Sequence, residues 1–217
     1  MRIRHPVSHG AAKIVRMQNS SCDSIVRLWL PGQPETPAFH VRVPTPGCVA
    51  LDADACPGSG PSSPLTILLR RSPSPAGMPA RQPWMFPSRG ITNALRQLRS
   101  SLIGPLRRPG LIGVDLADYE SALSLGGRIR FERASSRDAK TCAMHLSQAF
   151  TYVPAALCVH LRLPEGTTIG EIDHALGVID AALSSGTREV FCVFAANLER
   201  RRNVAATALA IDGGIHA

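Results

Sequence analysis

Proline is distributed very unevenly along this chain of 217 residues. The first 90 residues hold 14 of the 18 prolines, which leaves four for the rest of the chain. Proline has a fixed φ and no backbone N–H, so it is excluded from helix interiors and from central strands. We therefore expect a Pro- and Arg-rich arm, or a degenerate remnant of a domain, over residues 1–90. A compact domain should follow over residues 91–217, with the boundary near 88–90.

The expected arm contains only short candidates for regular structure. Residues 11–18 could form a short helix, and residues 24–30, 38–43 and 64–70 read as extended pieces between clusters of Pro, Gly and Ser. These few strands are not enough for a domain. We therefore expect this segment to be poorly structured.

Beyond Gly90 the hydrophobic periodicity predicts alternating helices and strands. Apolar residues recur at helical spacing from Ile91 to Leu102, and Pro105 should end that helix. The other expected elements are helices over 116–125, 135–150 and 168–186, and strands over 127–134, 156–163, 189–196 and 203–211. This order predicts an α+β fold, with a four-stranded sheet that carries its helices on one face and ends in a hairpin.

Two carboxylates mark the point where a loop becomes the helix over 116–125. They belong to the string PGLIGVDLADYE, from Pro109 to Glu120, and are Asp115 and Asp118. Acids at a helix start are stabilised by the unpaired backbone N–H groups and the helix dipole, by about 0.3–1 kcal/mol each when exposed. The two acids can therefore serve the helix itself or a ligand outside the chain, and both interpretations stay open.

The same string resembles the loop pattern PGLxNxDxAD of the FtsZ/tubulin family of filament-forming GTPases. The resemblance continues through GGRIRFERASSRDAKTCAMHLSQA, AALCVHLRLPEGTTIGEIDHALGVIDAAL and REVFCVFAANLERRRNVAATALAIDGG, so it covers about residues 91–213. These strings are similar to the C-terminal domain of FtsZ. The family's GTPase domain precedes that region and carries a GGGTGSG phosphate loop, which this sequence lacks. The resemblance thus implies a truncated relative that is not a self-contained GTPase.

The resemblance also implies roles for residues of the loop between Pro109 and Glu120. In the family it reaches the nucleotide of the neighbouring subunit, and its acids help to orient the attacking water. Asp115 and Asp118 would then be catalytic residues acting in trans, and Gly113 would be the nucleotide-contacting position where the family pattern has Asn. The implied cofactor is GTP with Mg²⁺ held by a partner, with none bound by this chain alone. The implied partner is an FtsZ-type subunit or a second copy, in the cytoplasm of a dividing bacterium.

Two alternatives to this function stay open, and the first concerns the charge of the chain. The formal net charge is +8, of which residues 1–90 carry +6. A basic arm of this kind could bind nucleic acid or a membrane surface. Alternatively, the chain could be an inert structural remnant or a scaffold that associates with itself through its first helix.

Other kinds of site find little support in the sequence. None of the six cysteines forms a CxxC pair, so we expect no metal site, and His145, His160 and His174 lie in separate expected elements. Gly58–Pro64 contains glycine but lacks the lysine of a phosphate loop. No stretch approaches the roughly 18 apolar residues of a membrane span, and the N-terminus lacks the apolar run of a signal peptide. We therefore expect an intracellular protein.

Overall fold

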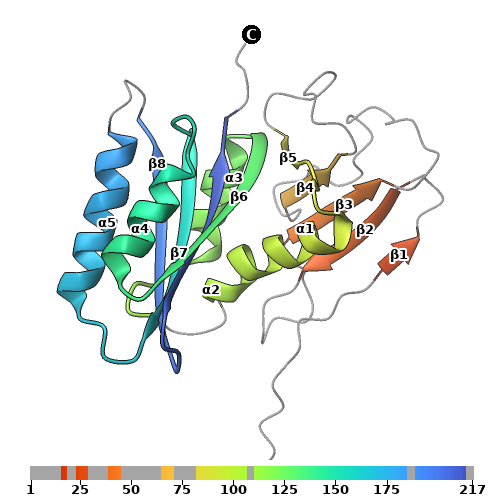
Figure 1. Cartoon of the computed structure of the whole chain (residues 1–217). Helices are drawn as coiled ribbons and strands as arrows, with labels where there is room; N and C mark the ends of the chain where they lie inside the picture. The colour runs from red at the N-terminus through yellow and green to blue at the C-terminus, as the bar shows by residue number, and fades with distance from the viewer. Residues whose placement is uncertain are drawn as a thin grey trace, which may run out of the picture.

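The computed structural model describes residues 16–18, 23–28, 39–44, 65–70, 82–106, 110–184 and 189–213. Within these ranges nine strands form one mixed sheet, in the order β1-β2-β3-β4-β5-β6-β9-β7-β8 (Figure 1). The strands are β1 Arg16–Gln18, β2 Asp23–Leu28, β3 Phe39–Pro44, β4 Leu65–Leu69, β5 Pro83–Met85, β6 Gly127–Ser136, β7 Ala156–Pro164, β8 Phe191–Glu199 and β9 Val204–Ile211.

The helices of the described part lie between these strands. They are α1 Ile91–Leu98, the π-helical turn η2 Arg99–Ile103, α2 Gly104–Leu106, α3 Leu116–Ser124, α4 Ala139–Gln148 and α5 Ile169–Leu183. None of them combines the length and apolar character needed to cross a bilayer.

The prediction of a four-stranded sheet is wrong. The four expected strands exist as β6, β7, β8 and β9, but β6 also pairs with β5 in parallel, which joins them to the strands of the first 90 residues. The expected terminal hairpin is also wrong, because β9 lies between β6 and β7, and the strand that pairs with β8 is β7. All eight residues of β9 are buried, and most of them are small, which suits a central strand.

The extended pieces predicted at 38–43 and 64–70 are present as β3 and β4. Each has alternate buried residues, and proline stands at the last position of β3 and just before β4. Proline therefore limits these strands to a few residues and does not prevent them. Of the helix expected over 11–18, the last three residues form β1 instead, and residues 11–15 lie outside the described ranges. The domain boundary near 88–90 stays a prediction.

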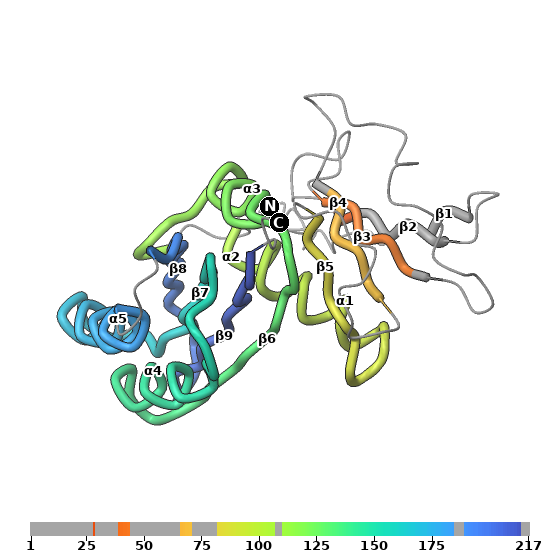
Figure 2. Tube along the Cα trace, turned by 90° about the horizontal axis from the view of Figure 1, so that it is seen from above, coloured from red at the N-terminus to blue at the C-terminus, as the bar shows by residue number. Residues whose placement is uncertain are grey.

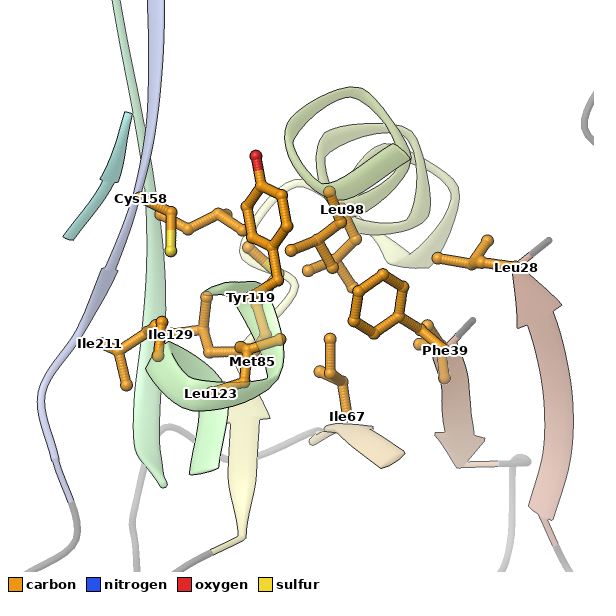
Figure 3. Close-up of a cluster of buried hydrophobic side chains, with 14 of the residues drawn as sticks. Leu28, Phe39, Ile67, Met85, Leu98, Tyr119, Leu123, Ile129, Cys158 and Ile211 are labelled. Carbon is orange, nitrogen blue, oxygen red and sulfur yellow. The ribbon is translucent and has the colours of Figure 1, made fainter. Parts of the chain in front are cut away.

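Helices cover both faces of the sheet, as Figure 2 shows. On one face α4 and α5 pack together, and their Leu146, Ile172 and Ile179 meet Val159 of β7 and Ala208 of β9. We expected all helices on one face of the sheet, and this is correct for α4 and α5 but not for the others. The other face is covered by α1, η2 and α3, where one buried cluster combines side chains from both parts of the chain (Figure 3). That cluster includes Leu28, Phe39, Ile67, Met85, Leu98, Leu102, Tyr119, Leu123, Ile129 and Cys158.

Two element boundaries differ from the prediction for local reasons. Pro105 does not end the first helix directly: the chain widens into η2 and then makes a short turn that contains the proline. A π-helical turn shifts the pattern of backbone hydrogen bonds, so the missing N–H of Pro105 costs fewer of these bonds. The helix expected from 135 begins only at Ala139, because β6 pairs with β9 as far as Ser136 and Asp138 supplies the N-cap.

The mixed core predicts that the first strands contribute to the stability of the whole chain. Phe39 of β3 is fully buried in the cluster with α1 and α3. We expect Phe39→Ala to lower the free energy of unfolding by about 3–5 kcal/mol, since it removes a large buried ring. Urea denaturation followed by circular dichroism should show a single transition at lower urea. Phe191→Ala, at a ring that is 42% exposed, is the control and should change little.

Candidate functional site

The acids at the start of α3 form a reciprocal capping box. The Asp118 N–H donates to Oδ1 of Asp115 at 2.9 Å, and the Asp115 N–H donates to Oδ2 of Asp118 at 2.9 Å. The helix therefore begins at Leu116, with the N-cap that the sequence pattern indicates. Each carboxylate uses one oxygen in this way. Within the described residues the second oxygen of each makes no hydrogen bond or ion pair.

The loop before α3 is fixed to the edge of the sheet. The Leu111 N–H donates to the Ala196 carbonyl at 2.7 Å, and the Ala196 N–H donates to the Ile112 carbonyl at 3.1 Å. Gly110 lies so close to β8 that a Cβ there would collide with the carbonyl oxygen of Ala196. The loop reaches α3 through Val114, which packs against the core. The acids are thus presented from a short segment that is anchored at both ends.

The predicted site residues lie at the surface. Asp115 and Gly113 are exposed, Asp118 is partly buried, and Leu111 beside them is an apolar side chain with 47% of its surface exposed. A Cβ at Gly113 would meet nothing within 4 Å, and its φ is not positive. An asparagine would therefore fit at this position without strain. The structure brings the three predicted residues together on one short surface segment, and their roles stay predictions.

Beneath this loop lies a buried polar pair that the sequence analysis missed. Nε2 of His160 in β7 donates to Oδ1 of Asn197 in β8 at 2.7 Å, with the ring tautomer set by that acceptor, and both residues are 5% exposed. Gly104 of α2 and Gly110 of the loop both approach the pair. Burial lowers the pKa of His160. The only sequence signal was a polar residue inside the expected strand 156–163 and another just after the expected strand 189–196, and this does not reveal that the strands are neighbours.

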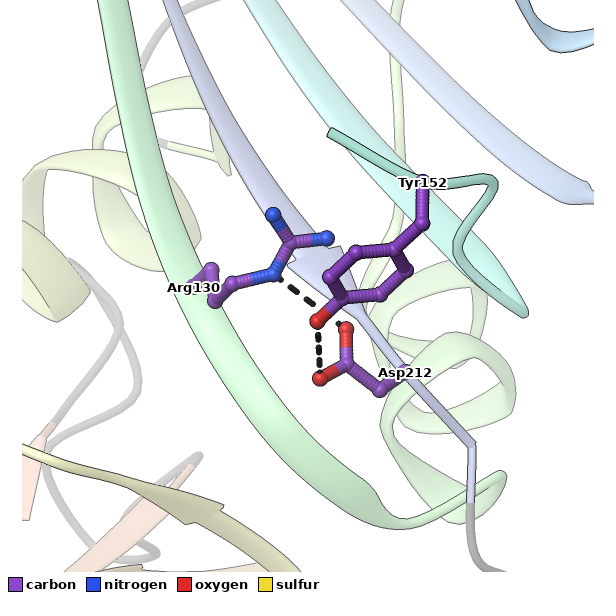
Figure 4. Close-up of polar contacts among 3 residues, drawn as sticks. All are labelled: Arg130, Tyr152 and Asp212. Atoms are coloured by element: carbon purple, nitrogen blue, oxygen red, sulfur yellow. Dashed lines mark hydrogen bonds and ion pairs between the residues drawn. The ribbon is translucent and has the colours of Figure 1, made fainter. Parts of the chain in front are cut away.

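A second polar group joins three separate segments on the other face of the sheet. Nε of Arg130 in β6 donates to Oδ1 of Asp212 at 3.3 Å, and the Tyr152 hydroxyl also donates to Asp212 (Figure 4). The Arg130 guanidinium lies 3.8 Å from the centre of the Tyr152 ring. Burial and the bond to Asp212 raise the pKa of Tyr152 to about 12. This group ties β6 and the end of β9 to the segment before β7, and sequence spacing gave no sign of it.

The described cysteines are poor candidates for chemistry. Cys142, Cys158 and Cys192 are free thiols, and burial raises the pKa of Cys158 to about 12 and that of Cys192 to about 11. Such thiols stay protonated and unreactive at neutral pH. Among the described residues no group of three His, Cys, Asp or Glu side chains is placed to hold a metal ion.

Comparison with known proteins gives a likeness of fold to FtsZ and TubZ. Neither a family profile nor a curated protein matches the sequence. Among solved structures, the chain is similar to a point mutant of FtsZ and to an empty FtsZ dimer, both from M. jannaschii, with 14% identity and a TM-score of 0.46 for each. It is also similar to TubZ of Bacillus thuringiensis serovar israelensis in GDP-form protofilaments, with 11% identity and a TM-score of 0.47.

These matches are partial in both directions. They cover 60%, 62% and 57% of this chain, but only 47%, 46% and 34% of the respective FtsZ and TubZ chains. This chain therefore matches less than half the length of those proteins. At such identities and TM-scores the likeness concerns the path of the backbone and carries no conclusion about a shared activity.

The capping box gives the first test at the site. Asp115→Ala removes the acceptor for the Asp118 N–H and should lower the free energy of unfolding by about 0.5–2 kcal/mol. Asp115→Asn keeps an oxygen at the same place and should unfold close to the unsubstituted chain. The measurement is urea denaturation of the three proteins side by side. An equal loss in both variants would mean that charge, and not the hydrogen bond, supports the helix.

The buried histidine predicts a dependence of stability on pH. The unfolded chain takes up a proton near pH 6.5, whereas burial keeps folded His160 neutral to lower pH. The free energy of unfolding should therefore decrease as the pH falls below about 6.5, until folded His160 is protonated as well. His160→Gln should remove this part of the pH dependence, and His174→Gln, at an exposed position on α5, should leave it intact. A pH series of urea denaturation curves measures both.

Proposed function

We propose that this chain is a tubulin-type filament component that cannot use GTP alone and offers its acid loop to a nucleotide held by a neighbouring subunit. The loop is the segment 110–118, with Asp115 and Asp118 as the acting carboxylates. The neighbouring subunit is a complete FtsZ-type GTPase. The observation that carries the proposal is the pair of outward-lying acids on an anchored helix start, in a string that resembles the family's catalytic loop.

The geometry at the start of α3 supports such a role in two ways. Each carboxylate is oriented by one backbone hydrogen bond, so its direction is set before any partner arrives. The oxygen of each acid that is not engaged in the capping box can accept a hydrogen bond from a water molecule. Positioning of the attacking water is the main task of a protein side chain in phosphoryl transfer. Helix capping and action in trans therefore use different oxygens of the same two residues.

The surroundings of the acids fit a contact between subunits. Leu111 exposes an apolar side chain in the same segment, and β8 lies at the edge of the sheet directly behind it. An exposed apolar residue beside fixed polar groups is the composition expected for part of an interface. Because Gly113 replaces the asparagine of the family pattern, the loop lacks one amide group that would contact the nucleotide. We therefore expect the chain to modulate a partner's GTP hydrolysis only weakly.

The proposal is tested by adding the chain to a complete FtsZ. We expect it to sediment with the filaments and to change the rate of GTP hydrolysis. Asp115→Asn combined with Asp118→Asn keeps both capping hydrogen bonds and removes both charges, so the effect on hydrolysis should be lost while the fold is kept. Asp138→Asn is the matched control, because it neutralises another exposed N-cap acid, on α4. An unchanged filament mass and hydrolysis rate on addition of the chain would count against the proposal.

A gain-of-function variant makes the test sharper. Gly113→Asn restores the amide of the family pattern at a position with open space around its Cα. We expect this variant to fold normally and to increase the effect of the chain on a partner's GTP hydrolysis. A stable Gly113→Asn variant with no increase would indicate that the loop does not reach a nucleotide.

A further inference from the structure

The buried polar side chains of the described residues gather in one place. They are Ser101, His160, Asn197 and Thr207, each with at most 6% of its surface exposed. His160 of β7 is paired in register with Thr207 of β9, so both side chains point to the same face of the sheet. Asn197 of β8 accepts the hydrogen bond of His160 on that face. Three neighbouring strands thus contribute one polar group each.

The helix above these strands brings the fourth group. The chain from α1 to α2 crosses the strands, with η2 against β9 and β7 and with α2 against β8 (Figure 1). Gly104 lies over the ring of His160, because a Cβ there would meet its Nδ1 and Cε1 at 3.9 Å. Ser101 precedes Gly104 by three residues, about 4.5 Å along a helix, and neighbouring strands such as β7 and β9 lie about 4.8 Å apart. The buried Ser101 is therefore placed over Thr207.

Two of these four side chains lack a hydrogen-bond partner. Oγ of Ser101 and Oγ1 of Thr207 are buried, and neither makes a hydrogen bond within the described part of the chain. A serine in a helix commonly donates its hydroxyl to a carbonyl one turn earlier, as the adjacent Ser100 does to Gln97 at 2.9 Å. Ser101 does not. Buried hydroxyls without partners are costly, so two of them side by side indicate a bound polar partner.

The surroundings require this partner to be small. The side chains are too deeply buried to reach a substrate, so Ser101 and His160 do not form a hydrolytic pair. A Cβ on Gly104 would make only ordinary contact with the imidazole, which leaves room for a group of about the size of a methyl. Because Nε2 of His160 donates to Asn197, Nδ1 on the side of Gly104 is an acceptor. A water molecule fits this space and can donate and accept hydrogen bonds.

We propose that a bound water molecule bridges Ser101, Thr207 and Nδ1 of His160 beneath η2. The water donates to Nδ1 and forms its other hydrogen bonds with the two hydroxyls. About three hydrogen bonds to buried polar groups are usual for an internal water in a protein. This water joins η2 to β9 and β7. Through His160 and Asn197 the same network reaches the loop at Gly110, which packs on Asn197.

A direct count of internal water tests the proposal on the full chain. Magnetic relaxation dispersion of the water signal counts the water molecules that stay inside a protein for longer than its rotation takes. Ser101→Ala combined with Thr207→Val leaves the water a single partner, so we expect the count to fall by one. Ser100→Ala is the matched control. It removes the hydroxyl of the adjacent residue, which already has its acceptor, and should leave the count unchanged.

Urea denaturation gives a second readout whose sign depends on the water. Thr207→Val nearly keeps the shape of the side chain and removes one hydrogen bond to the water. The ratio of folded to unfolded protein should therefore fall about two- to tenfold. Ser101→Ala should cause a similar loss relative to Ser100→Ala, which corrects for the higher helix propensity of alanine. The double variant should lose less than the product of the two single losses, because both substitutions act on one water molecule.

Three results would overturn the proposal. The first is an equal or higher ratio of folded to unfolded protein for Thr207→Val, which would mean that its hydroxyl had no partner to lose. The second is an unchanged water count in the double variant, even if the two substitutions are coupled, since that would indicate a direct bond between the hydroxyls. The third is an equal fall of the count in Ser100→Ala. If the double variant does not fold, the sign of the change in Thr207→Val decides.

Discussion

The parallel pairing of β5 with β6 is the interaction on which the rest of the structure depends. It places Trp84 opposite Arg128 and so joins the short strands before residue 90 to the strands after residue 127. Because the sheet is continuous, one hydrophobic cluster can take side chains from β3, β4, α1 and α3. The buried Ala94 and Leu98 of α1 pack into this same cluster. The helix between the two parts of the chain therefore has its packing partners on both sides of position 90.

Local signals in the sequence predicted the helices and strands after Gly90. They could not predict which strands pair with one another. Some of these signals are local. The capping box of Thr168 and Glu171 marks the start of α5, and the positive φ angles of Gly126 and Gly127 follow the end of α3, so both can be recognised without knowing the fold. The order of the strands is different. The sequence of residues 204–211 does not indicate that β9 pairs with β6 and β7 and not with β8. The pairing of β9 depends on how the helices pack on the sheet.

The same distinction holds for the polar residues. Asp115 and Asp118 were predictable as a pair because a capping box is a local spacing, three residues apart. His160 and Asn197 are 37 residues apart, and only the pairing of β7 with β8 makes them partners. Their position beneath the loop has a mechanical consequence. A Cβ on Gly110 would lie 3.0 Å from Nδ2 of Asn197, so the segment that presents the acids packs directly on this pair.

Two charged regions of the fold also differ in how their charges are balanced. At the start of α3 two negative side chains face the positive end of a helix and its backbone N–H groups, so the chain itself stabilises them. Around β5, Arg70 at the end of β4 and Arg128 of β6 both lie over the Trp84 ring of the strand between them, at 5.7 and 5.9 Å from its centre. The ring stabilises both cations by cation–π contact, and Asp212 forms an ion pair with Arg130 on the same strand as Arg128. The acids are therefore balanced by backbone N–H groups of one local segment, whereas these arginines are balanced by side chains that only the pairing of the strands brings together.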